Sequence, residues 1–338
     1  MDNAHQQINY YDGSQQHPEP SHSTDGQRQR RHSHSTHASP THSSVNHGLV
    51  VDGGHSGRAH LKSIALTTIE AINNGLVDVT KAINRTRFYS PRSPELVNWR
   101  EARATTSWYK SRPSKILIAP MTTIEGTRCL HNSHPTRRLA ILNFASPTRP
   151  GGGFLEGASA QEESIARSSS LYFSLCSEAA RPFYALHAQD DKGGFYSHAM
   201  IYSRNIHLVR DDAGAWIAPF QVDVLTSPAV NAGKARKVYY TTPRNQLENA
   251  IREHMSERIA RVLALFEREG ARNLVLGSFG TGVFRNDIET MAVIWCELLL
   301  GPSARFASSF ENIVFAIPDR HTRRCFESIF CLGQRRNQ

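Results

Sequence analysis

Residues 139–163 read LAILNFASPTRPGGGFLEGASAQEE, so a strand signal, a loop and a helix start follow one another directly. The apolar run at 139–146 is typical of a buried strand. Three consecutive glycines, Gly151–Gly153, have no Cβ, and backbone N–H groups of this loop can therefore approach a ligand closely. The helix expected to begin near Gln161 places its N-terminus beside the loop, which makes a natural anion site. Taken alone, three glycines are equally consistent with a flexible surface turn.

A second glycine-rich loop, GSFGTGVF at 277–284, also follows an apolar strand and precedes a helix. We predict a capping box for that helix from Asn286 and Glu289. The glycine order G-x-x-G-x-G differs from the G-x-G-x-x-G of dinucleotide-binding folds, and the sequence has no G-K-[ST] of a P-loop. Two such loops at the carboxyl ends of strands could hold a diphosphate from two sides.

The rest of the chain alternates short β-rich runs with helical patterns. This alternation predicts an α/β fold, a three-layer α/β/α sandwich around a mixed central sheet. The expected strands cover 115–120, 138–146, 198–210, 222–230, 272–279 and 312–319. The expected helices cover 61–72 with a stop at Gly75, 159–177, 247–266 and a stretch from 286 to 299.

Charge is unevenly distributed along the chain. The first 57 residues carry three basic and five acidic side chains, and ten of the 17 histidines lie within the first 60 residues. The remaining 36 basic and 25 acidic side chains give the rest of the chain a formal charge of +11. Such a body attracts polyanions, either nucleic acid or a polyphosphate ligand. We predict that the histidine-rich segment is a solvated tail and not a metal site, because no scaffold would hold its rings.

Five cysteines without a C-x-x-C pair predict reduced, mostly buried thiols in an intracellular protein. The chain begins with no apolar signal core, and its longest apolar run, around Met291–Leu300, is too short to cross a membrane. We therefore expect a soluble protein of the cytoplasm or the nucleus.

The pair Glu162–Glu163 follows the three glycines closely enough to lie beside any phosphate that they bind, together with its attached sugar. Carboxylates at a helix start also stabilise the helix dipole, which is the purely structural interpretation. Adjacent helical residues point about 100° apart, so the two carboxyls cannot flank a bond as a conventional glycosidase pair does. One could hold ribose hydroxyls while the other transfers a proton. The transferring carboxyl must keep its proton near neutral pH, which requires burial or a neighbouring anion to raise its pKa.

These residues resemble the signature of bacterial-type poly(ADP-ribose) glycohydrolases, a microbial group that includes fungal members. The central match is GGG followed at this spacing by QEE, within 143–164. Further matching segments are ARSSSLY at 166–172, LTSP at 225–228, LGSFGTGVFRND at 276–287 and VFAI at 314–317. The likeness runs from about Arg58 to the last residues of the chain and leaves only the tail outside it.

The resemblance implies a macrodomain with an N-terminal helical extension that binds ADP-ribose in a cleft above the sheet. We accordingly divide the chain into a disordered His/Ser/Gln-rich tail at 1–57, a helical extension at 58–110 and a catalytic domain at 111–338. The implied activity is hydrolysis of ribose–ribose bonds in poly(ADP-ribose), with a leaning to release from chain ends. The implied partners are the polymer or ADP-ribosylated proteins, with ADP-ribose as product, and no metal, cofactor, membrane or DNA motif is implied.

The resemblance also assigns roles to residues. Glu163 would protonate the departing ribose oxygen and its carboxylate would then activate water, while Glu162 would orient ribose hydroxyls. The first loop would meet the diphosphate and distal ribose, and the second would form another phosphate loop, with Phe284 packing on the ligand. The expected substrate-binding residues are Gly151, Gly152, Gly153, Gln161, Asn143, Ser146, Ser227, Gly280, Thr281, Gly282, Val283 and Phe284.

Four positions depart from the family pattern and leave the glutamates untouched. Phe279 replaces a common tryptophan and Thr281 a common cysteine, while Arg204 and Val230 stand where proline is usual. These changes place substrate preference in doubt more than activity. Three other functions stay open at this point: a reader that binds ADP-ribose without cleaving it, a hydrolase of single ADP-ribose groups on proteins, and a basic nucleic-acid-binding protein. The last has no recognised binding motif to support it.

Overall fold

The computed structural model describes residues 53–101, 112–301 and 303–336. These residues belong to one compact unit, Val50–Gln338, and the segment Met1–Leu49 lies outside the described part of the chain. Most of the expected tail at 1–57 therefore falls outside the description. Its last five residues do not, since they form the first turns of a helix that begins at Gly53.

Seven strands form one mixed sheet in the order β1-β4-β5-β3-β6-β7-β2. Neighbouring strands from β5 to β2 pair in parallel, whereas β4 pairs antiparallel with both β5 and β1. Every strand except β4 thus runs in the same direction, so the loops that follow β3, β5, β6 and β7 meet at one edge. The strands are β1 (Arg87–Tyr89), β2 (Lys115–Ala119), β3 (Leu139–Phe144), β4 (Met200–Arg210), β5 (Trp216–Ser227), β6 (Asn273–Leu276) and β7 (Asn312–Ala316).

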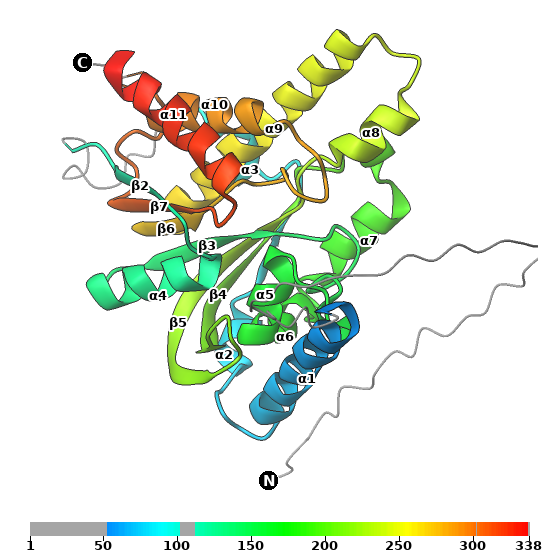
Figure 1. The fold of residues 1–338 in the computed structure, drawn as a ribbon, viewed down its shortest axis with the longest axis vertical. Helices are drawn as coiled ribbons and strands as arrows, with labels where there is room; N and C mark the ends of the chain where they lie inside the picture. The colour runs from blue at the N-terminus through cyan, green and yellow to red at the C-terminus, as the bar shows by residue number, and fades with distance from the viewer. Residues whose placement is uncertain (1–52, 102–111, 302, 337–338) are drawn as a thin grey trace, which may run out of the picture. The chain divides into compact units, whose positions relative to one another are not determined.

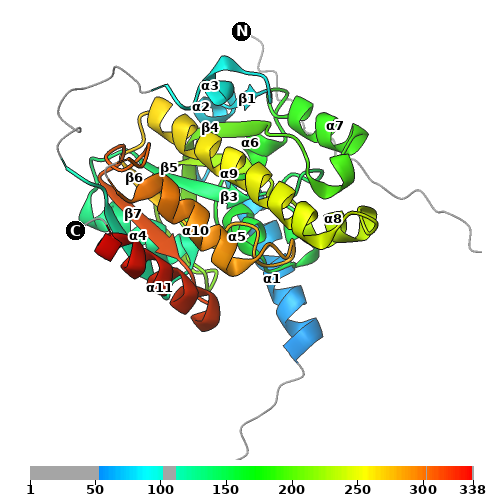
Figure 2. The same ribbon diagram turned by 90° about the horizontal axis from the view of Figure 1, so that it is seen from above.

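Helices cover both faces of the sheet (Figures 1 and 2). One buried cluster joins the sheet to α3, α9, α10 and α11, and a second joins its other face to α4, α5, α6 and α7. The three-layer arrangement predicted from the alternating pattern is therefore confirmed. The helices are α1 (Gly53–Asn73), α2 (Thr80–Asn84), α3 (Pro94–Val97), α4 (Thr123–Ser133), α5 (Gln161–Ser168), α6 (Leu171–Leu175), α7 (Arg181–Gln189), α8 (Ala232–Val238), α9 (Arg244–Arg268), α10 (Ile288–Leu299) and α11 (Arg320–Arg336), with short 3-10 turns η1 (Phe154–Glu156) and η2 (Lys192–Gly194).

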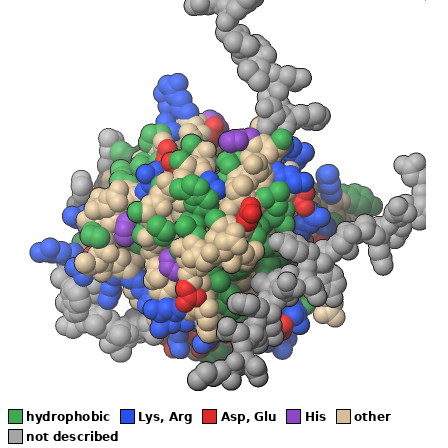
Figure 3. All heavy atoms as spheres, turned by 90° about the horizontal axis from the view of Figure 1, so that it is seen from below, with side chains coloured by type: hydrophobic (Ala, Val, Ile, Leu, Met, Phe, Trp, Pro, Cys, Tyr) green, Lys and Arg blue, Asp and Glu red, His purple; other side chains and the backbone are tan. Residues whose placement is uncertain are grey.

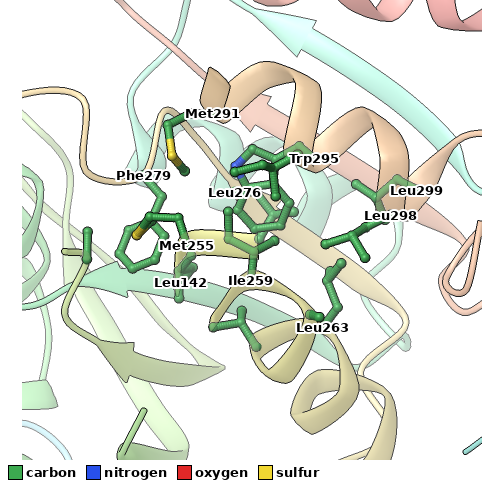
Figure 4. Packing of buried hydrophobic residues seen from close by; sticks show 14 of the residues in the cluster. Leu142, Met255, Ile259, Leu263, Leu276, Phe279, Met291, Trp295, Leu298 and Leu299 are labelled. Atoms are coloured by element: carbon green, nitrogen blue, oxygen red, sulfur yellow. The ribbon is translucent and has the colours of Figure 1, made fainter. Parts of the chain in front are cut away.

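The largest cluster lies between the sheet and the pair α9 and α10 (Figure 4). Trp295 and Ile259 are fully buried there, and each such side chain contributes about 1.5–3 kcal/mol to the hydrophobic stabilisation. Phe279, in the second glycine-rich loop, also has no exposed surface and packs with Met255 in this core. The core thereby fixes the start of that loop.

Helix α1 packs on the segment that carries the first glycine-rich loop. Its side chains Ala65, Ile69 and Ile72, at the predicted helical spacing, form a third cluster with Phe154 of η1 and with α5 and α6. The helix ends before Gly75, whose φ of 90° fits the predicted stop. The N-terminal helix thus supports the loop from outside the sandwich.

Two local predictions were wrong. The helix expected over 159–177 is broken into α5 and α6, because Ser169 is extended and bridges to Leu208 of β4. The capping box expected from Asn286 and Glu289 does not form. Asp287 caps α10 by accepting from the Thr290 N–H, and the Asn286 amide instead donates to the carbonyls of Gly280 in the second loop and of Val230 after β5.

Other features were missed or differ from expectation. The edge strand β1 and helix α4 were not foreseen, although α4 carries a complete capping box from Thr122 and Glu125. The five cysteines are free, but none is buried, which corrects the expected burial of the thiols. The helical extension expected at 58–110 contributes β1 to the sheet; its boundary at 110 lies in 102–111, outside the described residues, and stays a prediction.

The described residues contain neither a helix able to span a membrane nor a cluster of metal-ligating side chains. Within 53–101, 112–301 and 303–336, no helix combines the length and apolar character needed to span a bilayer. Over the same ranges, no group of three or more His, Cys, Asp or Glu side chains is arranged to hold a metal ion.

Candidate active site

A cavity of about 540 Å³ opens at the edge of the sheet where the parallel strands end. Its floor includes Phe144 at the end of β3 and Ala316 at the end of β7. The second glycine-rich loop, 278–284, and the start of α5, with Ser159 and Gln161, also line it. The first loop, Gly151–Gly153, and the pair Glu162 and Glu163 are not among the lining residues, so of the two predicted loops only the second is placed at this hollow.

The first loop folds over the two glutamates and depends on glycine to do so. Gly151 and Gly152 adopt φ values of 70° and 60°, in the left-handed region that favours glycine. A Cβ built on Gly152 would lie 2.2 Å from Oε1 of Glu163 and 3.1 Å from Oε2 of Glu162. No other residue could occupy this position without displacing the carboxylates.

Glu162 lies beneath the loop and is 3% exposed. Its Oε2 accepts a hydrogen bond from the Ser146 N–H at 2.6 Å, and its Oε1 accepts one from Nδ2 of Asn143 at 3.2 Å. Burial raises the pKa of Glu162 to about 8, against the opposing effect of these donors, and the nearby Glu163 raises it further. The raised pKa, which we expected of the carboxyl that transfers the proton, is thus found at Glu162, the carboxyl expected to orient ribose hydroxyls.

Glu163 is only partly buried, and its two oxygens differ. Oε1 accepts a hydrogen bond from the Gly153 N–H at 2.9 Å, so the glycine loop orients the carboxyl. Oε2 is buried and has no hydrogen-bond partner among the described residues. An oriented carboxyl with one uncommitted oxygen can exchange a proton with a substrate atom.

Gln161 fastens this helix to the sheet. Its amide oxygen accepts from the Phe144 N–H, and its amide nitrogen donates to the Leu142 carbonyl and to Oγ1 of Thr123. These bonds use the side chain to join α5 to β3 and α4. The structure thus gives Gln161, predicted to bind substrate, a positioning function, although it also lines the cavity.

The second loop is held equally firmly at its base. A Cβ on Gly280 would lie 2.6 Å from both the Ala229 Cβ and Nδ2 of Asn286. The Asn286 amide donates to the Gly280 and Val230 carbonyls. Beyond this base the loop is open, since Val283 is 80% exposed and nothing lies within 4 Å of a Cβ built on Gly282.

The remaining predicted residues are distributed around these two loops. Thr281 and Phe284 line the cavity, and Phe284 lies 6.1 Å from Tyr196 between ring centroids. Ser227 ends β5 beside Phe144 and is fully buried, with no partner for its Oγ among the described residues. Unlike Thr281 and Phe284, it does not line the cavity.

Two charged residues near the site were missed by sequence reasoning. Asp212, in the turn between β4 and β5, lines the cavity and accepts from Oγ1 of Thr122 at 2.6 Å; burial raises its pKa. Arg167 is 6% exposed and donates to the Ala158 carbonyl and to Oγ of Ser164. The helical spacing of Arg167 from Glu163 was the one available signal, while Asp212 is distant in sequence.

Comparisons with known proteins agree with this geometry. The family model of the microbial-type PARG catalytic domain, where PARG is poly(ADP-ribose) glycohydrolase, matches residues 67–211. Poly(ADP-ribose) glycohydrolase from Thermomonospora curvata is 35% identical and has a TM-score of 0.70, and the match covers 80% of this chain and 100% of that one. The chain belongs to the microbial-type poly(ADP-ribose) glycohydrolases. The recognition made from the two loops and the glutamate pair is therefore confirmed, together with the fold that it implied.

Relatives within the family have been solved with ligands. The T. curvata glycohydrolase with the inhibitor ADP-HPD is 34% identical, with a TM-score of 0.68 and coverage of 80% of this chain and 99% of that one. The enzyme from Deinococcus radiodurans in complex with ADP-ribose is 34% identical, with a TM-score of 0.65 and coverage of 76% and 98%. A comparison with curated proteins found no match.

The raised pKa of Glu162 predicts how the stability of this glycohydrolase depends on pH. Because the folded protein binds a proton that the unfolded chain releases near pH 4.5, the free energy of unfolding is expected to fall as the pH rises from about 4.5 to about 8. In Glu162→Gln this part of the decline should disappear, a difference on the order of 5 kcal/mol for the shift from 4.5 to about 8 at about 1.4 kcal/mol per pKa unit. Urea unfolding of the wild type and of Glu162→Gln between pH 4.5 and 8 measures this difference in the free energy of unfolding. Parallel pH profiles would contradict the prediction, and Glu156→Gln, which alters an exposed carboxyl of η1, is the control.

The contacts of Arg167 predict that it helps to position Glu163. Its guanidinium ties the end of the first loop, at Ala158, to α5 one turn beyond Glu163, and the Glu163 charge acts on it. Arg167→Met is expected to lower kcat about tenfold or more, because the loop that orients Glu163 loses an anchor. Arg167→Lys keeps the charge but not the planar fork of donors, so its kcat should lie between that of the wild type and that of Arg167→Met. Steady-state kinetics and thermal unfolding measure both effects, and a loss of stability with unchanged kcat would contradict the role in positioning.

Proposed function

We propose that this protein hydrolyses the ribose–ribose O-glycosidic bonds of poly(ADP-ribose) and releases ADP-ribose from chain ends, with Glu163 as general acid and base. One observation carries the proposal. The Gly153 N–H orients the Glu163 carboxyl and leaves Oε2 uncommitted, in the first turn of α5, whose residues Gln161 and Ser164 line a cavity together with the second glycine-rich loop. The complexes of relatives with ADP-ribose and ADP-HPD support such a ligand.

The reaction follows from this arrangement. A proton on Oε2 of Glu163 passes to the ribose oxygen of the leaving chain as the bond from that oxygen to the anomeric carbon breaks. The electron pair leaves with the oxygen, and the terminal ribose becomes an oxocarbenium-like species. Water then adds to the anomeric carbon while the Glu163 carboxylate takes its proton, which restores the acid. One water is consumed for each ADP-ribose released.

The other site residues would hold the substrate during these steps. The 280–284 loop can meet the diphosphate, since glycine permits close approach of the backbone. In the first loop the N–H groups of Gly152 and Gly153 already bind the Arg149 carbonyl and Glu163, so this loop would shape the site around the ribose and not donate to the diphosphate through them. Glu162, held beneath the first loop by Ser146 and Asn143 with its pKa raised by burial, would orient ribose hydroxyls. Phe284, at the cavity wall, would pack on the ligand. The protein's own groups thus supply both the proton transfer and the positioning.

Incubation of the purified protein with poly(ADP-ribose), followed by chromatography of the products over time, tests the proposal. The expected product is free ADP-ribose from the first time point, while the remaining chains shorten gradually. Early accumulation of oligomers would contradict release from chain ends. If ADP-ribose appeared only from mono-ADP-ribosylated protein and never from the polymer, the proposed substrate would be wrong.

A further inference from the structure

Arginines gather at the opposite end of the sheet from the cavity. Two adjoining hollows of about 330 and 410 Å³ lie there, and both are lined by Arg85 and Arg204. Lys and Arg side chains also lie around the margin of the face shown in Figure 3, with acidic side chains scattered among them. We define the arginine cleft by the charged residues that line the two hollows, which are Arg85, Arg87, Arg137, Arg138, Arg204, Asp223 and Glu269.

Two of the five arginines serve the fold. Arg138 pairs with the buried Asp223, and Arg204 binds the buried Glu269, whose other oxygen accepts from Tyr89. These pairs neutralise both carboxylates of the cleft. Of the other three arginines, Arg137 pairs with Glu311 beside the cleft, which leaves the charges of Arg85 and Arg87 in excess.

Two of those three arginines bind only neutral oxygens among the contacts of the described residues. Arg85 is exposed and donates to Oδ1 of Asn205. Arg87, also exposed, donates to the carbonyls of Asn84 and Thr86. Each guanidinium carries five N–H donors in a planar fork suited to phosphate, so most of their donors are uncommitted. The third, Arg137, lies 3.3 Å from Glu311.

The backbone at the cleft is distorted where these side chains meet. β4 is irregular against β5 between Ser203 and Ile206, and Asn205 there has a φ of 60°, in the left-handed region. Bulges and left-handed non-glycine residues are frequent at functional sites. The bulge also carries Arg204, one of the four departures of this chain from the family pattern.

We infer that the arginine cleft is a second binding site for poly(ADP-ribose), which holds diphosphate groups of the polymer away from the unit being cleaved. The inference rests on the proposed function, because it takes the same polymer as ligand. The length of β3, roughly 20 Å for six residues, separates the cleft from the cavity, so one ADP-ribose cannot fill both. A long chain can occupy both, and its repeated diphosphates match the cluster of guanidinium groups. Long polymers then bind more tightly than short ones.

The test compares two charge-matched double variants in a Glu163→Gln background, which keeps the polymer intact. Arg85→Gln with Arg87→Gln removes two cleft charges and spares the buried pairs of Arg138 and Arg204. Arg181→Gln with Arg252→Gln removes two exposed charges that line neither hollow nor the cavity. Fluorescence anisotropy measures the Kd for long poly(ADP-ribose) of defined length and for duplex DNA over a range of salt concentration. Calorimetry measures the Kd for ADP-ribose.

The cleft variant is expected to raise the Kd for long polymer about fivefold to tenfold and to reduce the slope of log K against log salt by roughly 1 to 1.5, with ADP-ribose affinity unchanged. A change no larger than in the control variant would overturn the inference. An equal loss of ADP-ribose affinity would also overturn it, because the arginines would then act through the cavity. A loss of affinity for duplex DNA alone, with the Kd for the polymer unchanged, would overturn it as well. The binding assay involves no cleavage, so a wild-type protein that released no ADP-ribose would refute the proposed function and leave this result standing.

Discussion

Replacement of Glu163 by Gln is expected to reduce kcat for ADP-ribose release about 10³-fold while the Kd for ADP-ribose changes little. Gln keeps the size of the side chain and an oxygen that can accept from the Gly153 N–H, so the loop retains its conformation. The amide cannot give or take the catalytic proton. Release of ADP-ribose measured by chromatography, with binding measured by calorimetry, separates the two effects.

Glu156→Gln provides the matched control for this experiment. Glu156 lies in η1, within the same loop, and its side chain is exposed. The Glu156→Gln variant changes the net charge by the same amount as Glu163→Gln and should retain nearly all activity. If Glu163→Gln lost no more than the control, or lost ADP-ribose binding in proportion to kcat, Glu163 would not be the proton donor.

Gly152→Ala is expected to lower kcat about 10²-fold and the free energy of unfolding by about 1–3 kcal/mol. The new methyl group would lie 2.2 Å from Oε1 of Glu163, so the carboxyl or the loop must move. A displacement of about 1 Å at a catalytic group can cost about 10²-fold in rate. The alanine would also be held at a φ of 60°, which adds backbone strain. Kinetics and thermal unfolding of the purified variant measure both losses.

Gly75→Ala is a control that separates the steric clash with Glu163 from the backbone strain of an alanine at positive φ. Gly75 has a φ of 90°, but a Cβ there meets nothing within 4 Å, and the residue lies after α1, outside the active site. This variant should lose about 1 kcal/mol of stability and no activity. If Gly152→Ala behaved in the same way, the close packing of the loop on the glutamates would not matter for catalysis.

The active-site loops could be predicted because their information is local. Glycines, a strand and a helix start lie within the 25 residues from Leu139 to Glu163, and the order of these signals determines their geometry. The strand predictions held where apolar runs were buried on both faces, as in β3 and β6. β1 has three residues and pairs only at the edge of the sheet, so it carries no pattern long enough to detect.

Features that depend on tertiary contacts could not be predicted. The pKa of Glu162 is raised because the first loop buries it, and the sequence does not show which of two adjacent carboxyls turns inward. Asn286 was assigned to a helix cap, whereas tertiary contacts with Gly280 and Val230 use its amide and leave the cap to Asp287. The arginine cleft likewise assembles residues from five separate segments of the chain.

A crystal structure of the Glu163→Gln variant with bound ADP-ribose tests the central claim most directly. We expect the diphosphate to lie between Gly151–Gly153 and the 280–284 loop, with the anomeric carbon of the distal ribose next to the side chain of residue 163. A ligand bound elsewhere, or one whose anomeric carbon lies outside hydrogen-bonding range of residue 163 and of any water that it could activate, would contradict it.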